Sequence, residues 1–200
     1  MVKESDQGGG GRRIPLRVNP LRLGRYYTQE HCWISIRTAD TIRIGLDPNL
    51  AARCAGSVGI SLPVVGREVQ ARSPLVWVRF GQGMIPVRLP LDVRVVSVNI
   101  HLTEDLSILV QDPYGKGWLV DARIDPSQLD ACRLMTSWIA DKIYSHDEQD
   151  FLQAVRDAGG MISKPTGFTA YDGGEVSPDV MSALGGGAYC ALVGHVYCKT

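Results

Sequence analysis

Eight short apolar segments between residues 32 and 124 constrain the fold of this 200-residue sequence more than any other feature. Each is four to eight residues long and is bounded by turn-forming residues, as in the stretches 38–40 and 63–66. Short, evenly spaced segments of this kind are typical of the strands of a β-sandwich or barrel. We therefore predict strands at residues 32–36, 41–46, 58–62, 68–71, 75–80, 84–89, 93–99 and 117–124.

One connection between these segments is predicted to be a tight hairpin. The apolar runs 75–80 and 84–89 flank the tripeptide Gly81-Gln82-Gly83. Glycine readily adopts the positive φ angles that tight hairpin turns need. Gln82 is therefore expected at an exposed tip between two paired strands.

A short helix is expected inside the β-rich part. Asp47 suits the N-cap position, Pro48 suits the first helical position, and Gly56 suits the residue that follows the C-terminus. These signals bracket the segment NLAARCA as a helix.

The apolar spacing changes after Ile124. Asp125 and Pro126 repeat the cap-then-proline signal, and apolar residues then recur at helical spacing. We predict that this helix packs a continuous apolar stripe onto the β-rich part. The stripe comprises Leu129, Cys132, Met135, Trp138, Ile139 and Ile143.

Two more helices are expected toward the C-terminus. Ser145 and Glu148 have capping-box spacing, which predicts the start of a second helix that ends at residues 159–160, a pair of glycines. A third helix is expected from residues 177–178, a Ser-Pro pair, to the glycines that begin at Gly185.

The closing segment AYCALVGHVYC, residues 188–198, resembles a strand. The predicted fold class is therefore mainly β with an α+β appendage. A flexible tail (1–13) precedes the β-rich domain (14–126), and a small extension of helices and a strand (127–200) follows it.

Composition and charge exclude several classes of protein. A hydrophobic content of 44% is enough for a packed core. No apolar run approaches the roughly 20 residues that span a bilayer, and the N-terminus has no apolar signal region. We therefore expect a cytoplasmic protein with no membrane partner.

The charges are unevenly distributed along the chain. Residues 1–100 hold 14 Lys/Arg and 7 Asp/Glu, whereas residues 101–200 hold 7 and 14. Because the arginines are scattered and not interleaved with aromatic residues, nucleic-acid binding is not expected. The two halves are expected to neutralise each other.

Five cysteines without a C-x-x-C pair favour free thiols. Cys190, His195 and Cys198 form the only cluster with metal-ligand chemistry. On a strand, His195 would point away from the two cysteines, and a fourth ligand such as Cys132 or His146 would be needed. Buried thiols without a metal are therefore expected, and a metal or reactive-thiol site is the alternative.

Three stretches, YYTQEHCWISI (26–36), IGLDPNLAARCAGSVGISLPVVG (44–66) and DPYGKGWLV (112–120), resemble one family, the glycine cleavage system H proteins. The resemblance covers residues 26–126 and implies a lipoyl-type barrel-sandwich hybrid fold. His31 lies in the first stretch, where structural packing is expected of it.

In the H-protein family, a lysine at the tip of a hairpin carries lipoate. Alignment from either side places that position on Gln82, flanked by Arg79, Gly81 and Gly83. A carboxamide cannot be acylated in this way, and no lysine lies between Lys3 and Lys116.

Lys116 belongs to the DPYG loop and is interpreted as a surface charge, so covalent lipoate is not expected. Gln82 with Arg79 and Arg88 could form a cationic finger for an anionic ligand or partner; the alternative is a tip without a function.

The expected function is that of a non-enzymatic, H-protein-like module without lipoate. It would bind or scaffold a protein partner, such as a glycine-cleavage or lipoate-handling enzyme. A binding module with a metal or reactive thiol in the extension is the alternative. An enzyme built on residues 127–200 has no positive support in the sequence.

Overall fold

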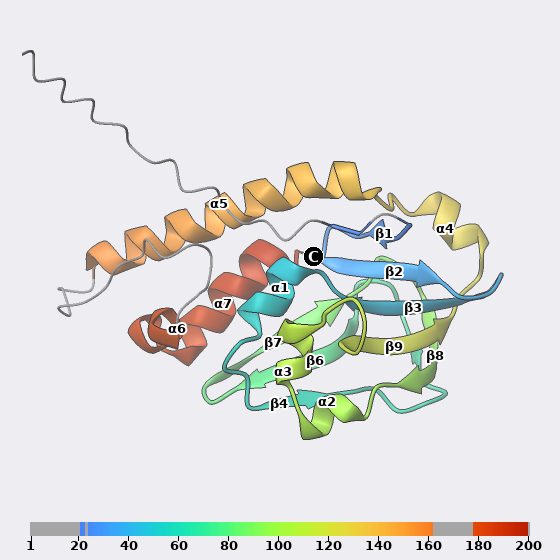
Figure 1. The fold of residues 1–200 in the computed structure, drawn as a ribbon, viewed down its shortest axis with the longest axis horizontal. Helices are drawn as coiled ribbons and strands as arrows, with labels where there is room; N and C mark the ends of the chain where they lie inside the picture. Colours follow the sequence, from blue (N-terminus) through green and yellow to red (C-terminus); the bar gives the residue numbers. More distant parts are fainter. Residues whose placement is uncertain (1–20, 23, 162–177, 200) are drawn as a thin grey trace, which may run out of the picture.

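The computed structural model describes residues 21–22, 24–161 and 178–199. Two antiparallel sheets form the β-domain, and the long C-terminal helices lie along one side of it (Figure 1). The first sheet has the order β1 (Tyr26–Tyr27), β2 (Cys32–Ile36), β3 (Thr41–Leu46), β9 (Trp118–Arg123), β8 (Val93–Val98) and β5 (Glu68–Val69). The second has the order β4 (Gly59–Ser61), β6 (Pro74–Phe80) and β7 (Gly83–Arg88).

Alternating side chains explain why these segments are strands. In β8, Val93 and Val95 are buried while Arg94 and Val96 are exposed, which is the two-residue period of a half-buried strand. The buried faces of both sheets contribute to one apolar core. The eight predicted strands are all present, and β1 is a further short strand that the sequence did not reveal.

The helix α1 (Pro48–Arg53) begins as predicted. The Asp47 side chain accepts hydrogen bonds from the backbone N–H groups of Asn49 and Leu50, at 2.6 and 3.3 Å. Two short helices that were not predicted, α2 (His101–Glu104) and α3 (Ser107–Gln111), lie between β8 and β9.

The prediction of one continuous helix over the stripe Leu129–Ile143 is wrong. Instead, α4 (Ser127–Ala131) ends early, and α5 begins at Ser137. Between them Met135 pairs with Tyr27 as in a sheet, through backbone hydrogen bonds of 2.8 and 2.9 Å. Pairing with the edge of the sheet satisfies backbone groups that a helix would otherwise have satisfied.

The predicted burial of this stripe is only partly right. Met135 is buried, but Trp138 is 68% exposed and Ile139 is 43% exposed in the first turns of α5. The Trp138 ring contacts the Lys142 ammonium group, at 3.9 Å from the ring centroid, and does not pack on the β-domain. The face of α5 that packs inward includes Ala140, Tyr144 and Phe151.

Two further corrections concern the C-terminal part. Ser145 and Glu148 do not cap a helix, because α5 runs without a break over Ser137–Met161 and passes through the glycines at 159–160. The predicted strand 188–198 is the helix α7 (Gly186–Tyr197). The third helix, α6 (Pro178–Leu184), is present as predicted.

The described part of the C-terminal extension is therefore helical, not α+β. In Figure 1, α5 runs along the top of the molecule above β1 and β2, and α7 lies below it beside α1. None of the helices within the described ranges combines the length and the apolar character that crossing a membrane requires.

Candidate functional site

The β6–β7 hairpin places Gln82 at its tip. Phe80 pairs with Gly83, and Gly81 and Gln82 form the two-residue turn between the strands. Gln82 and Arg79 are both exposed, and Met84, which pairs with Arg79, is 51% exposed. The tip is therefore an accessible surface with one amide, one guanidinium and one thioether.

The helix α7 packs against this hairpin near its tip. A Cβ atom added to Gly186 would lie 3.1 Å from the Cβ atom of Gln82, and one added to Gly83 would lie 2.9 Å from the Cys190 sulfur. Glycine at these positions lets the helix and the hairpin approach this closely. The Arg88 guanidinium donates to the Cys198 carbonyl at 3.4 Å, so α7 contacts the hairpin at both of its ends.

His31 joins the β-domain to the extension inside the protein. Its side chain is fully buried; Nδ1 lies 2.6 Å from an Asp47 carboxylate oxygen and Nε2 lies 3.2 Å from one of Asp147. The Lys199 ammonium group donates to the other Asp147 oxygen. The Tyr144 ring stacks on the imidazole at 3.9 Å between centroids.

The electrostatics of this group favour an imidazolium. Burial by itself lowers the pKa of His31, but the Asp47 charge and the hydrogen bonds with Asp147 and Asp47 outweigh it and raise the pKa above 6.5. Burial likewise opposes the Asp147 charge, yet hydrogen bonds from His31 and Lys199 leave the pKa of that carboxyl lowered. The protonated ring can donate from both nitrogens at once, which matches its two carboxylate neighbours.

A second buried pair lies next to the first. Arg53, on α1, donates to Glu148 of α5 at 2.5 Å and to the Tyr197 hydroxyl of α7 at 3.3 Å. Tyr197 in turn donates to Glu148 at 2.6 Å, and the Arg53 guanidinium lies 4.4 Å from the Phe151 ring centroid. Three helices thus meet at one buried group of charges, in which one nitrogen of Arg53, Nη1, has no hydrogen-bond partner.

The roles of Asp147 and Glu148 were missed in the sequence, although a signal was present. Tyr144, Phe151 and Val155 form the buried face of α5. Asp147 and Glu148 lie three and four residues after Tyr144, on that same face of a continuous helix. Carboxylates on an apolar face indicate buried partners, whereas the capping-box interpretation assigned them to a helix end.

The first and third family-like stretches meet in space and are structural. The Trp33 indole N–H donates to the Pro113 carbonyl at 3.0 Å, and the hydroxyls of Tyr27 and Tyr114 lie 3.2 Å apart. The Arg25 guanidinium lies 4.2 Å from the Trp33 ring. Lys116 is exposed in the same loop, away from this packing.

The predicted cysteine and histidine cluster does not assemble a metal site in the described part of the chain. Cys190 and Cys198 are buried, whereas His195 is exposed on α7. The alternation argument for this separation was wrong, because the segment is a helix. Of the suggested fourth ligands, Cys132 donates its thiol to the Pro90 carbonyl at 3.0 Å, and His146 is exposed beside Asp150.

The buried thiols are also poorly suited to reactivity. Burial raises the pKa of Cys198 to about 12 and raises that of Cys190 as well. Reactive cysteines need a lowered thiol pKa and access to solvent. The alternative of a reactive-thiol site therefore gains no support from these two residues.

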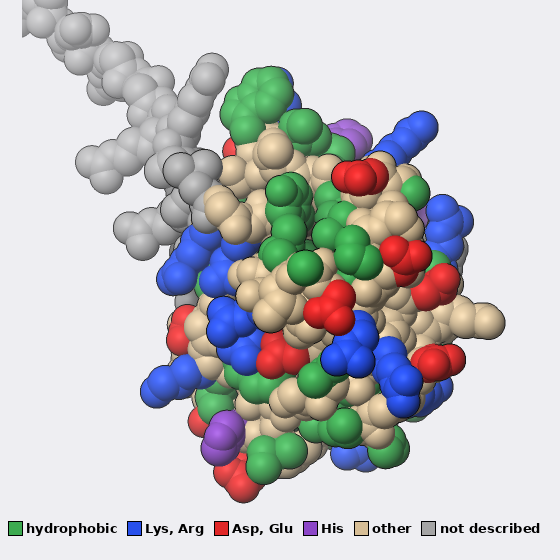
Figure 2. All heavy atoms as spheres, turned by 90° about the vertical axis from the view of Figure 1, so that its right-hand side faces the viewer, with side chains coloured by type: hydrophobic (Ala, Val, Ile, Leu, Met, Phe, Trp, Pro, Cys, Tyr) green, Lys and Arg blue, Asp and Glu red, His purple; other side chains and the backbone are tan. Residues whose placement is uncertain are grey.

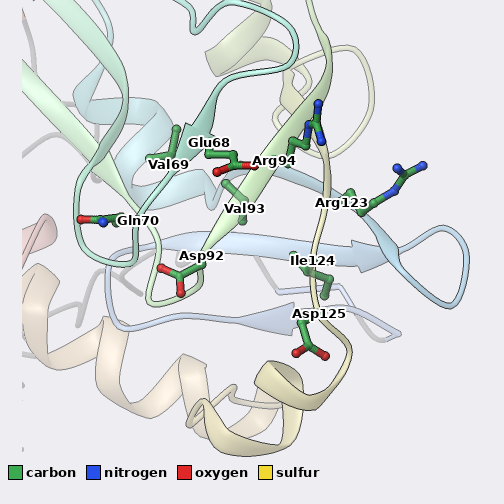
Figure 3. A pocket seen from close by; sticks show the side chains of 9 residues that line it. All are labelled: Glu68, Val69, Gln70, Asp92, Val93, Arg94, Arg123, Ile124 and Asp125. Atoms are coloured by element: carbon green, nitrogen blue, oxygen red, sulfur yellow. The ribbon is translucent and has the colours of Figure 1, made fainter.

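A cavity of about 520 Å³ lies elsewhere, along β5, β8 and the end of β9 (Figure 3). Its charged side chains are largely engaged in local structure: Asp92 accepts from the Ala71 N–H at 2.6 Å, Asp125 accepts from the Ser127 N–H at 3.0 Å, and Arg123 pairs with Asp40.

Figure 2 shows basic and acidic side chains interspersed on one face of the molecule. A single-sign surface of the kind that nucleic acids prefer is not visible on that face.

Comparisons with known proteins identify one family. A family model described as glycine cleavage H-protein matches residues 25–147. The glycine cleavage system H protein of Mycobacterium sp. (strain KMS) is 32% identical over 106 residues, which cover 53% of this chain and 81% of the relative. That of Mycobacteroides abscessus is 36% identical over 97 residues, which cover 48% and 73%.

A crystal structure of the glycine cleavage system H protein from Mycobacterium marinum is also similar. Its TM-score is 0.49 at 25% sequence identity, and the alignment covers 58% of this chain and 92% of that one.

Proposed function

Because this chain belongs to the glycine cleavage H-protein family, we propose that it is a protein-binding module of the glycine cleavage system. Proteins of this family are carriers and not catalysts, and they work with the glycine-cleavage enzymes. We propose the tip of the β6–β7 hairpin, with Arg79, Gln82 and Met84, as the contact surface for such an enzyme.

The expectation that lipoate plays no part is corrected by the family match. Members of the family carry lipoate covalently attached to a lysine, so lipoate is the cofactor that membership implies. The residue at the hairpin tip does not fit that group, because the Gln82 carboxamide has no amine to acylate. Gln82 therefore offers no attachment point for lipoate.

The observation that carries the proposal is the way in which the tip is held. Gln82 at the tip is exposed to solvent. On one side of the hairpin β4 pairs with β6, and on the other side α7 packs against β7. A surface held by flanking elements loses little conformational entropy on binding, which favours association. Arg79 can donate two parallel hydrogen bonds to a carboxylate of the partner.

A binding measurement with the full-length chain tests this function. Glycine decarboxylase from the same organism is titrated with the wild-type chain and two charge-reversal variants. Arg79→Glu should weaken binding by roughly tenfold or more, about 1.4 kcal/mol. Arg94 on β8 is also exposed, so Arg94→Glu is the matched control and should bind like the wild type.

Two results would contradict the proposal. One is a wild-type chain that does not bind glycine decarboxylase. The other is an equal effect of Arg79→Glu and Arg94→Glu, because the contact would then depend on net charge and not on the hairpin.

We also propose the division of the chain into a tail (1–13), an H-protein-like domain (14–126) and an extension (127–200). The tail lies outside the described residues. The family match continues to residue 147, so the first part of the extension has a counterpart within the family. The part that follows, with α6 and α7, lies outside the match.

A further inference from the structure

Two consecutive residues of α5 make buried ionic contacts with the β-domain. Asp147 contacts His31, which lies just before β2, and Glu148 contacts Arg53 on α1. Both contacts are buried. Of the two cations, only His31 has an ordinary pKa near the physiological range, because a guanidinium keeps its proton throughout.

The geometry around His31 requires a particular protonation state. One ring nitrogen lies 2.6 Å from Asp47 and the other lies 3.2 Å from Asp147. A neutral imidazole has a single N–H, so one of its nitrogens would direct a lone pair at a carboxylate oxygen. Asp47 also accepts from two backbone N–H groups of α1, so it is fixed within the β-domain. The contact that neutral His31 would weaken most is the one to Asp147.

We propose that His31 is a pH-sensitive fastening between the β-domain and the C-terminal extension. As an imidazolium it bridges Asp47 and Asp147 and helps to hold α5 and α7 in place, and as a neutral ring it weakens this attachment. The fastening joins two parts of one chain, so it does not depend on the function proposed for the hairpin.

Deprotonation of His31 would also affect the hairpin, because α7 contacts both. Lys199, two residues beyond the end of α7, donates to Asp147, and the Tyr197 ring packs edge-on against His31 at 4.7 Å. Both contacts connect the C-terminal end of α7 to the His31–Asp147 pair. The rest of α7 lies against the hairpin, where Cys190 contacts Gly83. Loosening the group would therefore uncover one side of β7.

The other groups around His31 do not change charge in the same pH range. From α5 and α7, Tyr144 and Tyr197 face the ring, and burial raises the pKa of both phenols. Next to it on β2, burial raises the pKa of the Cys32 thiol. With raised pKa values, these three groups stay neutral over the range in which His31 titrates. The charged groups that face the ring are Asp47 and Asp147, and Lys199 contacts Asp147.

The sign of the pH dependence follows from the two shifts. The pKa of His31 is raised on folding, so its contribution is complete below about 6.5 and is lost as the pH rises through the folded-state value. The pKa of Asp147 is lowered, so its contribution is lost only on acidification below about 3.8. The extension should be held most firmly between these two values.

Hydrogen exchange of the full-length protein tests this fastening. Protection of the α7 amides is compared at pH 5.5 and pH 8.5, after correction for the intrinsic exchange rates, with the β9 amides as an internal reference. In the wild type, α7 protection should fall relative to β9 as the pH rises, by about tenfold for each unit by which Asp147 raises the pKa of His31. Asp147→Asn should abolish this dependence, whereas Asp150→Asn, an exposed control on the same helix, should retain it.

Several outcomes would overturn the proposal. They are equal α7 protection at the two pH values in the wild type, an unchanged pH dependence in Asp147→Asn, and a His31 imidazole that titrates below 6.5 by NMR. If Asp147→Asn does not fold, the wild-type exchange and the His31 titration decide the question. A failure of partner binding by the hairpin would leave these results unaffected, so the two proposals fail separately.

Discussion

At the scale of single residues, the pair Arg53–Glu148 is the contact whose loss should reduce stability most. Both side chains are buried, so removing one leaves the other as an uncompensated charge. Glu148→Leu should lower the free energy of unfolding by about 3–5 kcal/mol in denaturant titrations. Asp150→Leu, on the exposed face of α5, should change it by about 0.5 kcal/mol or less.

The double variant Arg53→Met/Glu148→Leu distinguishes the charge effect from the loss of packing. It removes both charges and replaces them with apolar groups, which is often neutral for a buried pair. We expect it to recover most of the stability lost in Glu148→Leu. A double variant as unstable as the single one would show that shape and the Tyr197 hydrogen bond, not charge, dominate at this site.

Gln82 is the second residue with a direct test. A lipoate ligase should modify Gln82→Lys only weakly, because Arg79 places a positive charge near the tip and because α7 lies beside it. Adding Arg79→Glu should increase the modified fraction, measured by intact mass. Complete modification of the single variant would contradict both reasons, and a lipoyl mass on the wild-type chain would indicate another residue, such as Lys116.

At the scale of elements, the close approach of α7 to the hairpin can be tested with two glycines of the same hairpin. A methyl group added at Gly83 would lie 2.9 Å from the Cys190 sulfur, whereas one added at Gly81 would have no atom within 4 Å. Gly83→Ala should therefore cost about 1–3 kcal/mol of stability through overpacking. Gly81→Ala should cost much less, and equal effects would show that α7 does not press on the hairpin in solution.

The elements also show where local sequence signals succeed. Asp47 and Pro48 predicted the start of α1 because a cap needs only neighbouring residues. In β3, the alternation in TIRIGL predicted the bounds of the strand correctly, since one face of it lies on the core. Strand periodicity and capping are local properties, so a sequence reveals them without knowledge of distant contacts.

The segment 188–198 shows where such signals fail. Tyr189, Cys190, Val193, Val196 and Tyr197 are the buried residues of α7, and they follow helical spacing. Short apolar runs are ambiguous between helix and strand, and the aromatic and β-branched residues favoured a strand. The environment decided: α7 packs its buried face against β7 and α5, where a helix with its own backbone hydrogen bonds fits.

At the scale of the whole molecule, the extension should be essential for the stability of the β-domain. A chain that ends at Asp125 would expose Arg53 without Glu148 and His31 without Asp147, together with the apolar surface under α5 and α7. Burying each large apolar side chain contributes roughly 1.5–3 kcal/mol, so this loss is large. We expect the shortened chain to aggregate or to melt well below the full chain in calorimetry.

The opposite outcome is equally clear. If the shortened chain is monomeric and has the same melting temperature as the full-length protein, the extension is an independent module. The buried pairs would then contribute to the attachment of the extension and not to the β-domain itself.

The sequence by itself determined the β-domain, its family, the hairpin with Gln82 at its tip, and α1, because alternation, caps and family motifs depend on nearby residues. Only the tertiary structure decided the course of residues 127–161, the helical form of α7 and the pairing of His31 and Arg53 with Asp147 and Glu148. Those pairs join residues about 100 positions apart. A buried charge is stable only where its partner arrives, and that depends on how the whole chain packs.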